Sequence, residues 1–114
     1  MAITALKKVS TSWYIPEQEK DSDNPTRFLL RPLTPSQREE CMEISYAGLR
    51  IQPAQYKKVL AFGLAGWENF IDDSGVNVEF TRNNFDLIPG SLRIELALEI
   101  LMRSNLGDDE IKNS

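Results

Sequence analysis

The sequence predicts a single small α+β domain, and three observations support this class. The chain has 114 residues, of which 41% are hydrophobic and 26% charged, as in a single folded domain. Apolar and polar residues alternate with the period of a strand within residues 5–33 and again within 67–80. Elsewhere, apolar residues recur at helical spacing. We therefore expect about three main helices and two antiparallel β-hairpins in one domain over residues 1–114.

The first hairpin is expected near the N-terminus. The stretch from Ala5 to Ile15 alternates as a half-buried strand does. A second alternating stretch, TRFLLRPL, places Phe28 and Leu30 on one face and arginines on the other. Between the two stretches, residues 17–25 (EQEKDSDNP) are polar, acidic and rich in turn formers. We expect an antiparallel hairpin whose connection is an exposed acidic loop.

Two amphipathic helices are expected in the middle of the chain. Thr34 can cap a helix that has Pro35 in its first position and Gln37 in the capping-box position, and this helix is expected to continue to Ala47. A second helix is expected from Pro53, with an apolar arc formed by Tyr56, Val59, Leu60, Gly63 and Leu64. Each helix can bury one face.

The second hairpin is expected from Trp67 to Phe80. Two alternating runs, WENFI and VNVEF, are joined by DDSG, whose Gly75 can adopt a positive φ. Trp67 lies where the second helix gives way to this hairpin, and we expect its large ring to bridge the two elements in the core. One short helical turn is expected after it, between Thr81 and Leu87.

The last helix is expected from Leu92 to Arg103 and is the most apolar of the three. Its polar residues form one thin stripe, while residues 105–114 are polar and are expected to form a frayed tail. A helix of this composition must be covered on most sides. We therefore expect it to be the central core helix or to present part of its surface to another chain.

Composition excludes most common active sites. The chain has no histidine and one cysteine, which rules out Cys/His zinc sites, histidine-assisted nucleophiles and an intrachain disulfide. A net charge of -4 and a pI near 4.8 argue against a nucleic-acid binder with a basic surface. We expect no catalytic residue, no metal site and no cofactor.

The remaining polar clusters are explained by exposed surface or by turns, without a catalytic or metal-binding role. The carboxylates of Glu39, Glu40 and Glu43 belong to the exposed face of a predicted helix, where nothing tunes their pKa. Residues 72–75 (DDSG) resemble the start of a calcium loop but lack its closing glutamate, so a turn explains them. The glycines form neither a dinucleotide-binding fingerprint nor a phosphate-binding loop.

The sequence also shows no membrane-spanning segment and no targeting signal. The longest uncharged apolar stretch, Val59 to Trp67, is too short to cross a bilayer, and residues 1–20 show no signal-peptide pattern. We expect a cytoplasmic protein with no membrane partner, in which the lone Cys41 stays reduced.

Two stretches resemble the small tail assembly chaperones of long-tailed bacteriophages and prophages. The first is FLLRPLT, residues 28–34, followed by a charged helix. The second is GLAGWENFIDDSGVNVEFTRNNFDLIPGSLRIELALEIL, residues 63–101, which has a Gly-Trp-Glu, an acidic glycine turn and a Leu-Ile-Pro helix start in the order of that family. The resemblance covers Phe28 to Asn113.

The resemblance implies a non-enzymatic helper in the cytoplasm of the bacterial host. It implies binding to the long, apolar, helical tape-measure protein, which is thereby kept soluble while tail-tube subunits assemble around it. We also expect the protein to form homo-oligomers. The expected partner-binding residues are Tyr56, Val59, Leu60, Trp67, Ile94, Leu98 and Leu101.

Two other functions remain open at this point. A structural virion component, such as a head–tail connector, tube or minor tail protein, could use the N-terminal strand to extend a neighbour's sheet. An inhibitor of host defence could mimic DNA with an acidic surface, but a charge of -4 without a long acidic stripe argues against it.

Overall fold

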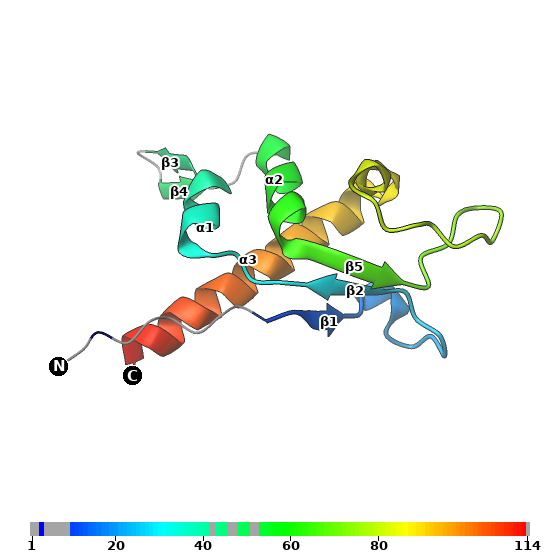
Figure 1. The fold of residues 1–114 in the computed structure, drawn as a ribbon, viewed down its shortest axis with the longest axis horizontal. Helices are drawn as coiled ribbons and strands as arrows, with labels where there is room; N and C mark the ends of the chain where they lie inside the picture. The colour runs from blue at the N-terminus through cyan, green and yellow to red at the C-terminus, as the bar shows by residue number, and fades with distance from the viewer. Residues whose placement is uncertain (1–2, 4–9, 42, 46–47, 51–52, 114) are drawn as a thin grey trace.

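The computed structural model describes residues 3, 10–41, 43–45, 48–50 and 53–113. Over these residues the chain folds into three α-helices, two short 3₁₀ helices, a three-stranded sheet and a two-stranded sheet (Figure 1). The elements follow one another in the order β1, η1, β2, α1, β3, β4, α2, β5, η2 and α3. The predicted α+β class and its three main helices are confirmed.

The three-stranded sheet is antiparallel and has β2 (Arg27–Leu30) at its centre. Its outer strands are β1 (Ser12–Tyr14) and β5 (Leu64–Glu68). The alternation predicted for β2 is confirmed, because Phe28 and Leu30 are fully buried while their neighbours are partly exposed. The predicted hairpin between β1 and β2 is also confirmed.

Strand β1 is shorter than predicted. Of the strand expected from Ala5 to Ile15, only β1 is formed in the described part of the chain, and residues 4–9 lie outside that part. Strand β2 ends at Leu30, and Pro32 two residues later has no backbone N–H with which to continue the pairing.

Two 3₁₀ helices lie in the connections. The first, η1 (Glu17–Glu19), opens the acidic loop 17–25, most of which is exposed as predicted. The second, η2 (Arg82–Leu87), is the short helical turn predicted in this region. Thr81 caps it, because its side-chain oxygen accepts the backbone N–H of Asn84 at 3.3 Å.

Helix α1 (Pro35–Cys41) begins as predicted but ends early. Thr34 and Gln37 form the predicted capping box, each side chain accepting the other's backbone N–H at 3.0 and 3.2 Å. The predicted continuation to Ala47 is wrong. Cys41 is the one buried residue among those of α1, so little apolar contact favours further helix.

The residues after α1 form a second, small sheet instead. Strands β3 (Glu43–Ser45) and β4 (Gly48–Arg50) pair in an antiparallel hairpin that the sequence analysis did not predict. Its central pair is Ile44 with Leu49, both of residue types that favour or tolerate strands.

Helix α2 (Pro53–Gly63) is the predicted second helix. It ends one residue before the predicted apolar arc does, because Leu64 is the first residue of β5 and pairs with Leu30. The predicted hairpin from Trp67 to Phe80 is confirmed around its turn, where the Asp72 N–H donates to the Val76 carbonyl and the Val78 N–H to the Phe70 carbonyl, but not at its start. Trp67 and Glu68 complete β5 against β2, and the turn that follows is closed by an isolated bridge between residues 71 and 77.

Helix α3 (Gly90–Asn113) is longer than predicted, because it continues through residues 105–113, which were expected to be a frayed tail. Once a helix is anchored by packing, each added residue gains a backbone hydrogen bond at little further cost. Figure 1 shows α3 crossing the molecule, with α2 and the sheet resting on it. The core between these three layers includes Phe28, Leu30, Val59, Leu60, Leu96 and Ile100.

Candidate partner-binding surface

Helix α3 carries three rows of side chains in three different surroundings. Residues three or four apart on a helix lie on the same face, so each row follows the helix axis. The core row is buried and comprises Leu92, Leu96, Ala97, Ile100 and Leu101. The polar row comprises Glu95, Glu99 and Arg103, and the third row comprises Ile94, Leu98 and Met102.

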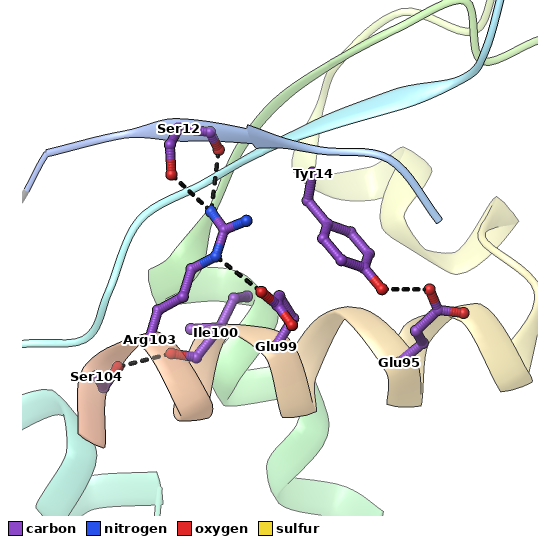
Figure 2. A network of polar contacts seen from close by, with 7 residues as sticks. All are labelled: Ser12, Tyr14, Glu95, Glu99, Ile100, Arg103 and Ser104. Atoms are coloured by element: carbon purple, nitrogen blue, oxygen red, sulfur yellow. Dashed lines mark hydrogen bonds and ion pairs between the residues drawn. The ribbon is translucent and has the colours of Figure 1, made fainter. Parts of the chain in front are cut away.

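The polar row attaches α3 to strand β1 (Figure 2). The Tyr14 hydroxyl donates a hydrogen bond to Glu95 Oε2 at 2.6 Å. Two turns further along, Arg103 donates to the backbone oxygen and hydroxyl of Ser12 at 3.2 and 2.7 Å. The same guanidinium donates to Glu99 Oε1 at 3.0 Å. These contacts join residues about 80 to 90 positions apart in sequence and determine how α3 is rotated against the sheet.

The surroundings of Tyr14 keep its phenol protonated. Burial raises the pKa of Tyr14 above its ordinary value of 10.0, and the hydrogen bond to Glu95 raises the pKa further. Tyr14 therefore acts as a hydrogen-bond donor at neutral pH. Its role is to hold the carboxylate of Glu95, which also accepts the backbone N–H of Glu17 at 3.2 Å.

The third row of α3 remains uncovered. Ile94, Leu98 and Met102 are 43%, 50% and 52% exposed, and we call them the apolar stripe. They are spaced four residues apart, so their side chains form one continuous ridge. With the core row buried and the polar row held by β1, neither the sheet nor α2 can cover this ridge.

The predicted partner-binding residues divide into three groups. Ile94 and Leu98 belong to the apolar stripe and are available to a partner. Val59, Leu60 and Leu101 are 0%, 2% and 6% exposed, so their assignment to a partner surface is wrong, because packing of α2 on α3 buries them. Tyr56 and Trp67 are partly buried against the same core.

Trp67 is the centre of an aromatic cluster. Its ring lies 5.1 Å from that of Phe70 and 4.8 Å from that of Phe80, with both pairs edge to face. It also contacts Phe28 and Phe85, and its indole N–H donates to the carbonyl of Val78 at 2.8 Å. The predicted bridge between the second helix and the hairpin is wrong in its partner, because these contacts join β5 to the turn that follows and none of them is with α2.

Met102 is the member of the stripe that the predicted site omitted. The signal was present in the sequence, because Met102 follows Leu98 by four residues. Apolar residues lie on nearly every side of this helix, so periodicity alone could not show which rows are buried and which row is exposed.

Metal-ligating side chains and the single cysteine are the remaining candidates for chemistry in the described residues. No group of three or more Asp, Glu, Cys or His side chains among them is placed to hold a metal ion. Burial raises the pKa of the Cys41 thiol, which makes its thiolate less available as a nucleophile. No helix in the described ranges has the length and apolar character needed to cross a bilayer.

No family model, curated protein or solved structure matches the chain. Its function must therefore be argued from the surfaces of the molecule itself.

Proposed function

We propose that the protein is a non-enzymatic assembly chaperone that binds an apolar helical partner through the apolar stripe. One observation carries the proposal: three half-exposed apolar side chains lie one turn apart on a helix whose other two rows are occupied. A ridge of this spacing is suited to packing along another helix. The resemblance of residues 28–113 to tail assembly chaperones suggests the tape-measure protein as this partner, with tail-tube assembly as the process served.

The stripe accounts for a modest share of such binding. Completing the burial of three half-exposed apolar side chains contributes about 1 kcal/mol each, or about 3 kcal/mol together. Micromolar binding requires about 8 kcal/mol. A partner helix must therefore contact more than the stripe, and α3 offers further length toward Asn113.

The proposed chaperone would act by covering apolar surface on its partner and by keeping the complex in solution through its negative charge. An apolar helix that awaits assembly aggregates through its exposed face, and contact with the stripe covers part of that face. The net charge of -4 gives the complex a repulsive exterior. Such a helper needs no reaction centre, because its effect comes from reversible contact.

Co-expression tests the proposal. The first step is to ask whether a long, coiled-coil-rich protein is encoded immediately downstream. Such a protein is the probe, and its solubility is expected to depend on the presence of this chain. Leu98→Glu, in the middle of the stripe, is expected to abolish that dependence. Leu87→Glu is the matched control, because Leu87 is 58% exposed on η2, outside the stripe. If the partner stays insoluble with the wild type, or if both variants act alike, the proposal fails.

A structural component of the particle is a second candidate, favoured by one observation. The three-stranded sheet is open, so β1 and β5 both lie at its edges. An edge strand can pair with a strand of a neighbouring subunit. Protein analysis of purified particles separates the two functions, because a chaperone leaves before the particle is complete and a structural component remains.

A further inference from the structure

A groove lined by basic residues lies between α2, η2 and the start of α3. It has a volume of about 370 Å³. Lys57 and Lys58 come from α2, Arg82 from η2 and Arg93 from α3, whereas Asp86 is the one acidic residue in the lining. Four positive charges and one negative charge give the groove a net charge of +3 on a chain whose net charge is -4.

The positive charges of this basic groove are largely unpaired within the described part of the chain. Arg93 faces Asp86 at 4.0 Å, the outer limit of an ion pair. No ion pair joins Lys57, Lys58 or Arg82 to another described residue. Between the charges, the partly exposed side chains of Ala61 and Phe85 line the groove with apolar surface. Its occupant should therefore carry both carboxylates and apolar side chains.

The turn after β5 has the complementary chemistry. Residues 69–79 contain Asp72, Asp73 and Glu79 but no Lys or Arg, which gives this acidic turn a charge of -3. Ile71 and Val76 are 55% and 60% exposed on it. Figure 1 shows this segment projecting beyond the end of β5, away from α2.

The acidic turn is a preformed structure. Asp72 Oδ1 accepts the backbone N–H groups of Ser74 and Val76 at 2.9 and 3.0 Å, and Gly75 adopts a φ of 80°. The Asp72 N–H also donates to the Val76 carbonyl at 2.9 Å. A preformed turn loses little conformational entropy when it binds.

We infer that the basic groove of one copy of this chain receives the acidic turn of a second copy. Net charges of +3 and -3 oppose one another, and Ile71 and Val76 meet the apolar floor at Ala61 and Phe85. The two surfaces are different parts of the molecule, so the contact is head-to-tail and a pair of copies keeps one free groove and one free turn. Such contacts extend into a ring or an open filament. The contact is small and charged, so its affinity is modest and weakens as salt rises.

Sedimentation of three full-length proteins tests this contact. A groove variant, Lys58→Glu, reverses one charge of the lining. A turn variant, Ile71→Ser with Val76→Ser, removes the apolar side chains but keeps Asp72 and Gly75, which shape the turn. Each variant alone is expected to self-associate at least about tenfold more weakly than the wild type. Lys20→Glu is the matched control, because it makes the same charge change on an exposed lysine of the acidic loop.

Mixing the two variants separates this contact from any other mode of association. The groove variant retains a native turn and the turn variant a native groove, so the mixture is expected to form a one-to-one dimer that grows no further. The Leu98→Glu background removes contacts through the apolar stripe from all of these measurements. A strictly monomeric wild type, variants that associate like the wild type, or a mixture that stays monomeric would each overturn the inference. None of these results bears on the co-expression test of the chaperone function.

Discussion

At the scale of single residues, Trp67 combines the largest aromatic contact with a satisfied polar group. Its ring touches four phenylalanines, and its indole N–H is bonded to Val78. We expect Trp67→Ala to lower the free energy of unfolding by about 3 kcal/mol, because the ring is partly rather than fully buried. Trp67→Phe, which keeps a ring but loses the N–H, should cost less. Urea denaturation measures both, and an unchanged midpoint for the alanine variant would contradict this role.

Because of Tyr14, the free energy of unfolding is expected to depend on pH in the alkaline range. Its pKa is raised in the folded state above the ordinary value of 10.0, so between these two values the folded protein holds a proton that the unfolded chain releases. The stabilisation from this residue is complete below about pH 10 and declines as the pH rises above it. Thermal unfolding at pH 8 to 11 should show this decline in the wild type.

The variant Tyr14→Phe isolates that contribution. It removes the hydrogen bond to Glu95 and should cost about 1 kcal/mol at neutral pH, since the Glu17 N–H still satisfies the carboxylate. The decline above pH 10 should be smaller in the variant than in the wild type. Identical pH profiles for both proteins would show that Tyr14 does not carry the effect.

At the scale of elements, the close approach of α2 to α3 depends on a glycine at the end of α2. A Cβ at Gly63 would lie 2.6 Å from Ile100 Cγ2 and 3.1 Å from the backbone oxygen of Arg31. We expect Gly63→Ala to destabilise the fold by about 1 to 3 kcal/mol, because neither neighbour can move freely.

Gly66 provides the matched control for this prediction. It lies three residues further along in β5, and a Cβ there would meet Leu29 at an ordinary 3.6 Å. Gly66→Ala should therefore change stability little. Denaturant unfolding of both variants tests the packing argument, which fails if the two substitutions cost the same.

The elements also show where sequence patterns are reliable. The capping box at Thr34 and Gln37 correctly located the start of α1, because its hydrogen bonds are local to one turn. The end of α1 and the pairing of Trp67 were predicted wrongly. The pairing of Trp67 depends on a partner distant in sequence, since Trp67 pairs with Phe28 in the central strand. The end of α1 depends on competition with the hairpin of β3 and β4 that follows it.

At the scale of the whole molecule, the difference between the rows of α3 can be measured as stability. Leu96 is fully buried and Leu98 is 50% exposed, although they are two residues apart. Leu96→Glu should unfold the protein, because it buries an unpaired carboxylate. Leu98→Glu should change the free energy of unfolding by no more than about 0.5 kcal/mol. Circular dichroism melts distinguish these outcomes, and equal destabilisation would mean that the apolar stripe is part of the core.

The sequence by itself determined the α+β class, the starts of the main helices, the alternation in β2 and the absence of histidine chemistry. These features depend on local periodicity, on capping within one turn or on composition. The tertiary structure alone decided which apolar row of α3 is left exposed and which charges gather in one groove. Nearly every side of α3 has apolar residues, so its rotation is set by contacts with Ser12 and Tyr14, about 80 to 90 positions away. Likewise, Lys57, Arg82 and Arg93 become neighbours only when α2, η2 and α3 pack together, and no sequence period encodes that packing.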